Sequence, residues 1–350
     1  MTSEASTYLE MHRDRIDRLP LPAVLSAPEI MAATFPPPAW VVPGLIPEGL
    51  SILAGAPKQG KTFFAFQLAS ALSRGGTFLG KRVDRTETLA VFLEDSAARI
   101  QRRFHKTGLH AGEALSFAHT WGTGEDALLM LAQYLSIRPE TKFIIVDTLG
   151  CVKPKGAEFN SYDDMYSFLK SIGDFCRTFG VSVLVIAHLK KSEETDWLMR
   201  IGGSAGITGG TDTNLVLERT RGEADAVLHV NGREVEESDF ALRFNRETCT
   251  WELLGDAGEY AQTKERRELL DILKACRSPE GLRTKEIASA LGKSDSSVSY
   301  LLRKLADENL VETTKYGHWK SPQSTQSPQS DGDIADIGDF AGTLEGVGHA

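Results

Sequence analysis

The chain has 350 residues, of which 41% are hydrophobic and 25% are charged, and its 48 acidic and 39 basic side chains give a formal charge of −9. This composition is typical of a globular protein with two domains, or with one large domain and an appendage. The negative charge excludes a histone-like, purely electrostatic nucleic-acid binder, although it leaves room for a local basic surface.

The four cysteines are Cys151, Cys176, Cys249 and Cys276. None of them has a CxxC spacing, which argues against a zinc ribbon and a dithiol redox site, and so low a number is typical of the reducing cytosol. No apolar run approaches the ~20 residues that span a bilayer, and the first residues lack the apolar stretch of a signal peptide. We therefore expect a cytoplasmic protein that makes no contact with a membrane.

Residues 1–38 are expected to form a polar, partly helical segment and the start of a proline-rich strap, because the prolines of FPPPAWVVPGLIPEG (35–49) forbid a long helix. From Leu50 onward, apolar runs typical of strands alternate with stretches of helical spacing. They are LSILA (50–54), KTFFAFQLASALSR (61–74), TLAVFLED (88–95), AARIQRRFHKTG (97–108), KFIIVDTLG (142–150), SYDDMYSFLKSIGDFCRTFG (161–180) and VSVLVIAHLKK (181–191). The alternation predicts an α/β domain over 39–256, with a mostly parallel sheet that has helices on both faces. After Gly210, four short apolar runs without helices predict an antiparallel extension of the same sheet.

A phosphate-binding loop is the strongest motif in the chain. Residues 55–62, GAPKQGKT, match G-x-x-x-x-G-K-[ST] between an apolar strand and a good helix. In such a loop the backbone amides and the helix start cradle the β-phosphate of a nucleotide. We expect Lys61 to neutralise the β and γ oxygens of ATP and Thr62 to offer its hydroxyl to Mg²⁺. The alternative is a glycine-rich turn with a surface lysine. The predicted nucleotide-binding residues are Gly55, Ala56, Pro57, Lys58, Gln59, Gly60, Lys61, Thr62 and Phe63.

Three polar residues at the ends of later strands complete the predicted catalytic set. Asp147 ends an apolar strand and is the second expected Mg²⁺ ligand, the alternative being a turn or helix-capping aspartate. Glu94 is the expected general base for the attacking water, in preference to the adjacent Asp95, unless both form a solvated pair. His188 ends the next strand and is expected to contact the γ-phosphate, although a histidine there can also be an ordinary satisfied polar residue.

These motifs resemble the RecA-like P-loop ATPase core of hexameric replicative helicases, above all the plasmid RepA-type helicases and the related ATPases of phages and integrative elements. The resemblance covers about Trp40–Leu254 and rests on PEGLSILAGAPKQGKT, FLEDSAARIQRRFHKTGL, FIIVDTLG, VIAHLKK and RIGGSAGI. It implies a homo-oligomer, most often a hexamer, in which Glu94 activates water and His188 senses the γ-phosphate.

The resemblance implies two further kinds of contact. The loop from Lys190 to Gly206 would line a central pore and bind single-stranded DNA through Lys190, Lys191 and Arg200. A basic finger from the neighbouring subunit corresponds to Arg233 in VLHVNGRE, with Arg246 in FNRET as the second candidate. The alternative for Arg233 is an ordinary surface charge.

Residues 264–320 have the pattern of a small C-terminal domain. A helix over 264–275, a capped helix over 284–291, a helix over 296–309 and a hairpin turning at Tyr316-Gly317 resemble a winged helix-turn-helix, whose second helix enters the major groove. The module is expected to bind duplex DNA, or alternatively a partner protein. The acidic tail over 321–350 is expected to be disordered. The expected DNA contacts are Ser297, Tyr300, Arg303, Lys304 and Lys315.

The sequence therefore favours an ATP-driven, DNA-acting motor, specifically a hexameric replicative helicase of a plasmid, phage or integrative element. Two alternatives stay open: a RecA-like recombination or loading ATPase that does not unwind DNA, and an ATP-sensing transcription regulator that reads DNA through the C-terminal module.

Overall fold

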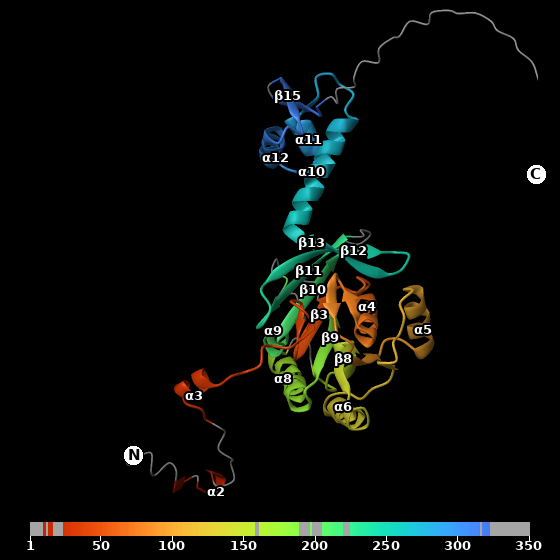
Figure 1. Cartoon of the computed structure of the whole chain (residues 1–350), viewed down its shortest axis with the longest axis vertical. Helices are drawn as coiled ribbons and strands as arrows, with labels where there is room; N and C mark the ends of the chain where they lie inside the picture. Colours follow the sequence, from red (N-terminus) through yellow and green to blue (C-terminus); the bar gives the residue numbers. More distant parts are fainter. Residues whose placement is uncertain are drawn as a thin grey trace, which may run out of the picture. The chain divides into compact units, whose positions relative to one another are not determined.

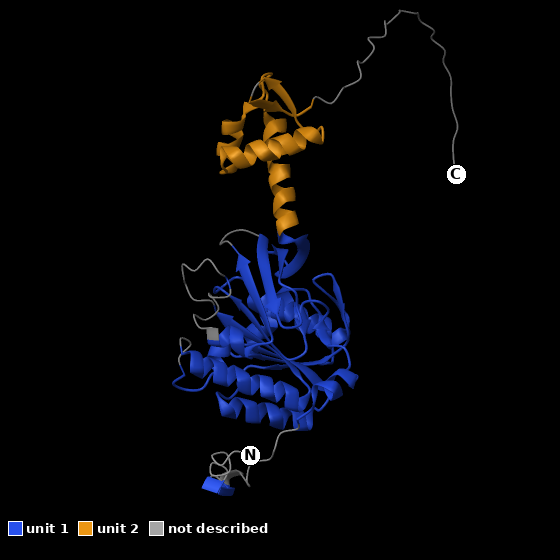
Figure 2. Cartoon of the chain, turned by 90° about the vertical axis from the view of Figure 1, so that its left-hand side faces the viewer, with its two compact units in different colours: residues 1–257 blue, residues 258–350 orange. Residues whose placement is uncertain are grey.

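The computed structural model describes residues 10–11, 13–16, 24–157, 161–188, 197, 205–219, 225–315 and 317–322. The chain divides into two compact units, Met1–Ala257 and Gly258–Ala350, which Figure 2 colours separately. Among the described residues, no helix combines the length and the apolar character needed to cross a membrane.

A large sheet forms the centre of the first unit (Figure 1). In the described part of the chain its order is β13-β12-β11-β10-β3-β9-β8-β6-β7. The pairs from β10 to β7 are parallel, and those from β10 to β13 are antiparallel. The strands are β3 (Leu50–Gly55), β6 (Glu87–Phe92), β7 (Leu115–Ala118), β8 (Thr141–Asp147), β9 (Ser182–His188), β10 (Thr213–Arg219), β11 (Asp225–Gly232), β12 (Ser238–Asn245) and β13 (Thr250–Asp256).

The predicted mostly parallel sheet is therefore confirmed, with one correction. Of the four strands after Gly210, β10 does not belong to the antiparallel extension alone, because it also pairs in parallel with β3. It thus joins the two parts of the sheet. Its side chains from Thr213 to Leu217 are buried, as expected for a central strand that is covered on both faces.

Helices cover both faces of the sheet. The apolar side chains of α4 (Lys61–Arg74) and α5 (Ala97–Lys106) share one buried cluster with Phe92 of β6. Those of α6 (Glu125–Ile137) and α8 (Tyr162–Phe179) belong to the cluster on the other face. Two short helices, α7 (Leu149–Val152) and α9 (Ala205–Gly210), also contribute to that second cluster.

Shorter elements complete the first unit. The expected proline-rich strap includes a small ladder whose residues Val42, Leu45 and Ile46 are buried in the core. A second ladder follows α4. The elements are α2 (Arg13–Ile16), α3 (Ala27–Ala32), β1 (Trp40–Val42), β2 (Ile46–Pro47), β4 (Gly76–Phe78) and β5 (Lys81–Val83).

The parallel strands determine where the functional side chains meet. Gly55, which begins the phosphate loop, is in register with His188, and Phe92 is in register with Asp147. Because parallel strands all end at one edge, the residues that follow β3, β6, β8 and β9 converge there.

The second unit has its own small core, formed by Leu269, Leu273, Ile287, Val298 and Leu302 among others. Its first helix begins at Ala257, seven residues before the predicted start at Lys264. The strand order is β14-β16-β15. The elements are α10 (Ala257–Ala275), β14 (Leu282–Arg283), α11 (Thr284–Leu291), α12 (Asp295–Asp307), β15 (Glu312–Lys315) and β16 (His318–Lys320).

Candidate functional site

The phosphate loop connects β3 directly to α4, as its mechanism requires. Gly60 is the N-cap of α4 with φ +103°, a backbone conformation that residues with a Cβ rarely adopt. A Cβ on Gly60 would also lie 2.9 Å from Cζ2 of Trp251. Only glycine therefore fits here, both for the turn and for the indole packed against it.

Lys61 is buried within the loop, with 5% of its surface exposed. Its Nζ donates to the backbone oxygens of Gly55 at 2.6 Å and Ala56 at 3.0 Å, and it lies 3.2 Å from Nδ1 of His188. Burial lowers the pKa of Lys61 to about 8, against the opposing effect of the charges of Asp147 and Glu94. The two carboxylates therefore do not fully offset the cost of burying the ammonium group.

Thr62 and Asp147 meet at the start of α4. The Thr62 hydroxyl donates to Oδ2 of Asp147 at 2.7 Å. Burial raises the pKa of Asp147, partly offset by the Thr62 hydrogen bond. No group of three or more His, Cys, Asp or Glu side chains in the described residues could enclose a metal ion. One carboxylate beside one hydroxyl instead fits Mg²⁺, which is usually bound by one or two carboxylates together with substrate phosphates.

The adjacent carboxylates Glu94 and Asp95 point to different surroundings. Oε1 of Glu94 accepts a hydrogen bond from the Thr148 hydroxyl at 3.2 Å and lies 3.4 Å from Nε2 of His188. Its side chain is half exposed, at 52%. Glu94 therefore borders the phosphate loop and remains accessible to water.

Asp95 is instead turned toward α5. It is buried, and its two oxygens pair with Arg99 at 3.2 Å and with Arg103. The Arg103 guanidinium also lies 4.8 Å over the ring of Phe63. Asp95 thus joins the end of β6 to α5 and α4, and both of its oxygens are already engaged.

An aromatic and arginine stack beside the phosphate loop was not predicted from the sequence. The Arg219 guanidinium lies 4.6 Å from the ring centre of Phe244 and 5.8 Å from that of Trp251. Nε1 of Trp251 donates to the Gly60 oxygen at 3.2 Å, and Gln59 donates to the Arg219 oxygen at 3.0 Å. The antiparallel strands therefore contribute one wall next to the loop.

The two candidate finger residues lie at different edges of the sheet. Arg233 donates to Oδ1 of Asp212 at 2.9 Å, and Leu50 donates to Oδ2 of the same carboxylate. Leu50 begins the strand that Gly55 ends, so about 17 Å of strand separates this ion pair from the phosphate loop. Arg246, after β12, instead lies near enough to Arg219 for their charges to interact. The structure thus does not bring Arg233 to the phosphate loop of its own chain.

The predicted DNA contacts are described in part. Lys190, Lys191 and Arg200 lie outside the described residues. On α12 of the second unit, Tyr300 is 71% exposed. Three further contacts, Ser297, Arg303 and Lys304, are also exposed on this helix. Lys315 of β15 is exposed and pairs with Glu280 at 2.5 Å.

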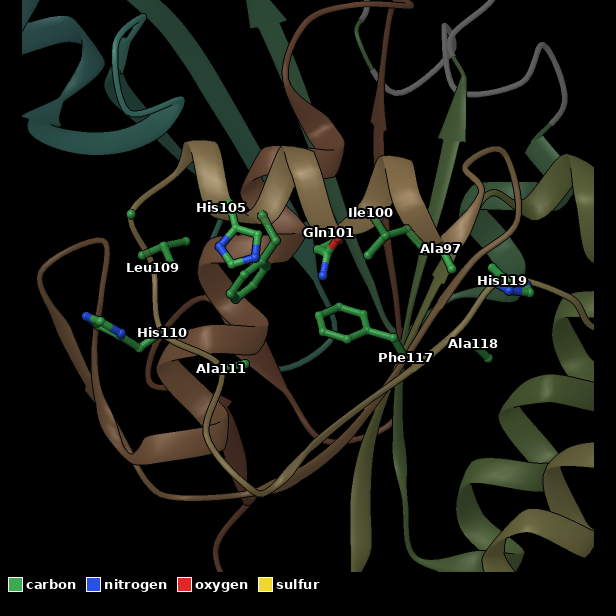
Figure 3. A pocket seen from close by; sticks show the side chains of 12 residues that line it. Ala97, Ile100, Gln101, His105, Leu109, His110, Ala111, Phe117, Ala118 and His119 are labelled. Carbon is green, nitrogen blue, oxygen red and sulfur yellow. The ribbon is translucent and has the colours of Figure 1, made fainter.

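A separate apolar cavity of about 660 Å³ lies between α5 and β7 (Figure 3). Ile100, Phe104 and Phe117 line it, and His105 and His119 are among its polar residues. None of the site residues predicted from the sequence lines this cavity. We therefore assign it no part in nucleotide chemistry.

Two families of known proteins match separate parts of the chain. The family described as AAA domain matches residues 16–194, just over half of the chain. The bacterial regulatory proteins of the arsR family match residues 263–313. The fold class is therefore as expected, with a RecA-like α/β domain followed by a C-terminal helix-turn-helix domain.

Two solved structures are also similar to this chain. One, described as an ATPase domain, is 14% identical with a TM-score of 0.49, and the match covers 59% of this chain and 85% of that one. A DnaB-like replicative helicase, described with its interactions with primase, is 14% identical with a TM-score of 0.48 over 70% of this chain and 71% of that one. No curated protein matches the chain.

Proposed function

Because this chain belongs to the AAA domain family, we propose that it is an ATP-hydrolysing, DNA-acting motor, and specifically a hexameric replicative helicase of a plasmid, phage or integrative element. One observation carries the proposal. The phosphate loop, a magnesium-type hydroxyl and carboxylate pair, and an accessible glutamate all converge at one sheet edge, in a chain that also contains a helix-turn-helix.

ATP binding is assigned to the loop over 55–63. Its backbone amides and the start of α4 would hold the β-phosphate, and Lys61 would pair with the β and γ oxygens. Thr62 and Asp147 fit Mg²⁺, which would supply charge neutralisation at the phosphates. Lys61 donates to two backbone oxygens of the loop, so its ammonium already points into the space that the loop encloses.

Hydrolysis requires a base for the attacking water, and Glu94 is our choice. It is accessible to water, whereas both oxygens of Asp95 are engaged by arginines. His188 lies between Lys61 and Glu94, so it can contact the γ-phosphate and the base together. Thr148 would orient the Glu94 carboxylate through its hydroxyl.

The nucleotide base is assigned to the stack of Arg219 on Phe244. A planar guanidinium seated on an aromatic ring offers a flat, polarisable surface for a purine, and it lies beside Gly60. Two hydrogen bonds hold this stack beside the phosphate loop: Gln59 of the loop donates to the backbone of β10, and Gln67 of α4 donates to that of β13.

Arg233 is proposed to act on a neighbouring subunit. The ion pair with Asp212 holds it at the sheet edge opposite its own phosphate loop, so it can complete a nucleotide site only in trans. A basic finger of this kind stabilises the charge that develops on the transferred phosphoryl group. Arg246 is the less favoured candidate, because it lies on the phosphate-loop side of the sheet.

Two DNA-binding surfaces are proposed. Lys190, Lys191 and Arg200 would contact single-stranded DNA through its phosphates. Residues of α12, namely Ser297, Tyr300, Arg303 and Lys304, would contact duplex DNA together with Lys315. Their exposure is consistent with that role, and a partner protein is the alternative occupant of the same surface.

A second candidate function is favoured by the match of residues 263–313 to bacterial regulatory proteins. In this alternative the chain is a transcription regulator, with ATP as the signal and α12 as the reader of a specific operator. Such a regulator needs neither strand separation nor a finger in trans. The third alternative, a recombination or loading ATPase, needs the finger but not the strand separation.

Three measurements on the full chain separate these functions. A helicase shows ATP hydrolysis stimulated by single-stranded DNA, separation of a forked duplex, and ATP-dependent rings in mass photometry. Stimulation without separation favours the loading ATPase. Sequence-specific duplex binding, with hydrolysis indifferent to single strands, overturns the motor and favours the regulator. Lys61→Ala is the inactive control in each assay.

A further inference from the structure

A row of four side chains connects the base stack to the ion pair beside the candidate base. At one end, the Arg219 guanidinium of β10 lies 4.6 Å from the ring centre of Phe244 of β12. The Phe244 ring centre lies 6.0 Å from that of Phe63 on α4, with the planes inclined by 52°. At the other end, the Arg103 guanidinium of α5 lies 4.8 Å over the Phe63 ring. All three separations fall within the range in which rings attract rings or cations, so the row is continuous.

Phe63 is the residue at which the two ends of the row meet. Its ring is partly buried and packs against the cluster under α4, where it also meets the ring of Phe66 edge to face at 6.1 Å. In the chain it directly follows Thr62, whose hydroxyl donates to Asp147 at 2.7 Å. A change in the position of the Phe63 ring therefore acts on the first turn of α4, which carries the hydroxyl expected to bind Mg²⁺.

The Arg103 end of the row lies in the part of the site that is assigned to hydrolysis. Arg103 pairs with the buried Asp95, which Arg99 contacts at 3.2 Å. Asp95 directly follows Glu94 in the chain, so an ion pair that fixes Asp95 also fixes the backbone from which the Glu94 side chain extends. The charge of Arg103 also reaches Asp147, where it opposes the rise in pKa that burial causes.

We propose that Phe63 is a positioning residue through which the base of the nucleotide sets the rate of hydrolysis, and not only the affinity. This inference rests on the proposed ATPase function and on the base stack. A base seated on Arg219 immobilises that guanidinium and the Phe244 ring. Phe63 then holds Arg103, with its ion pair, in the arrangement that directs Glu94 toward the γ-phosphate. Packed side chains cannot move independently, and misplacing a catalytic group by about 1 Å can cost about 10²-fold in rate.

The test compares ATP with ribose triphosphate, which is ATP without its base. Single-turnover hydrolysis at saturation gives the rate of the chemical step, and its concentration dependence gives the affinity. In the natural chain this rate should be about five-fold higher for ATP. Phe63→Leu, which keeps an apolar side chain but loses the ring, should lower the ATP rate to that of ribose triphosphate and leave the latter nearly unchanged. Phe63→Tyr, which retains the ring, should keep most of the ATP rate.

A second variant tests whether the row acts as one unit. Arg219→Ala should lower the ATP rate by the same factor as Phe63→Leu, and the double variant should lower it no further, because both changes interrupt one connection. Arg219→Ala carries the test alone if Phe63→Leu does not fold. The matched control is Phe179→Leu, which breaks a ring pair with Phe175 on the other face of the sheet and should leave both rates unchanged.

The outcomes distinguish this inference from the proposed function. Equal losses on ATP and ribose triphosphate in Phe63→Leu mean that the ring supports the loop whatever the substrate, and they overturn the inference. A lower affinity for ATP at an unchanged rate does the same. Equal rates for the two substrates in the natural chain leave the ATPase function intact and overturn the inference alone, whereas absence of hydrolysis overturns both. Circular dichroism and the unfolding midpoint show which variants are folded.

Discussion

Nδ1 of His188 lies 3.2 Å from the ammonium nitrogen of Lys61, and Nε2 of the same ring lies 3.4 Å from Oε1 of Glu94. An ammonium group can only donate, so Nδ1 must accept and the ring proton must be on Nε2, directed at Glu94. A neutral imidazole therefore joins the lysine of the phosphate loop to the candidate base. A γ-phosphate that separates Lys61 from His188 would change the hydrogen bonding of Glu94 in the same step.

The first prediction concerns pH. The pKa of Lys61 is lowered to about 8, and bound phosphate, being negative, raises it again. Above pH 8, ATP binding must therefore take up a proton, and affinity should fall by up to about ten-fold per pH unit. Titration calorimetry in two buffers of different ionisation enthalpy measures that proton directly. An affinity that stays constant from pH 7 to 9.5 would contradict the assignment.

The second prediction separates the two adjacent carboxylates. Glu94→Gln should retain ATP binding and thermal stability but slow hydrolysis by ~10²-fold or more, since the base is removed. Asp95→Asn should instead lower the free energy of unfolding by about 1 to 2 kcal/mol, because the buried side chain loses its charge-assisted hydrogen bonds to Arg99 and Arg103. Single-turnover hydrolysis and denaturant unfolding of both variants show which carboxylate acts in catalysis and which one stabilises the fold. Slow hydrolysis with full stability in Asp95→Asn would reverse the roles.

The sequence alone predicted those helices and strands that a single local pattern determines. Helical spacing over 61–74 predicted the bounds of α4 correctly, and the phosphate-loop motif demands a helix that begins there. Apolar runs likewise identified β3, β8 and β9, which are buried on both faces. The convergence of Asp147 and His188 then follows from parallel strands.

The sequence did not predict contacts that depend on which strands pair or on the direction in which a side chain points. Arg219, Phe244 and Trp251 come from three strands, and only the pairing of those strands brings them to Gly60. Glu94 and Asp95 are neighbours whose roles differ because one side chain meets α5. The spacing of Arg99 and Arg103, four and eight residues after Asp95, was the available signal for that ion pair.

The third prediction tests the base stack. Arg219→Ala should raise the KM for ATP about ten-fold, because the base no longer has its stacking partner, with little change in inhibition by inorganic tripolyphosphate, which has no base. Arg243→Ala is the matched control, since Arg243 lies on β12 and pairs with Asp225. Equal effects on ATP and tripolyphosphate would show that Arg219 acts on phosphate or on the loop rather than on the base.

The fourth prediction tests the finger. Arg233→Ala and Lys61→Ala chains should each be nearly inactive alone, with a decrease of ~10³-fold or more for the finger. Mixed after subunit exchange, they should recover part of the turnover, because some interfaces pair an intact loop with an intact arginine. Steady-state hydrolysis across mixing ratios measures this recovery. Absence of rescue, with exchange verified by mass photometry, would count against a site shared between subunits.

The fifth prediction concerns α12. Replacing Arg303 and Lys304 by alanine should weaken duplex binding and reduce its salt slope by about 0.9 for each phosphate that is no longer neutralised. Stimulation of hydrolysis by single-stranded DNA should be unaffected. The matched control replaces Lys274 and Arg277, which precede α11. Fluorescence anisotropy with a labelled duplex at several salt concentrations supplies the slope, and an unchanged slope would favour a protein partner for α12.

Arg233 and the phosphate loop lie at opposite edges of one sheet. On the proposed assignment, each subunit therefore presents two separate parts of a nucleotide site, and they face in opposite directions. Interfaces between unlike halves are head-to-tail, and they either close into a ring or continue as an open chain. On the proposed assignment, a ring has as many complete sites as subunits, whereas an open chain always leaves one loop and one arginine unused. Dilution alone would then stop ATP hydrolysis, because it separates the subunits. The rate of hydrolysis per subunit would measure the degree of assembly.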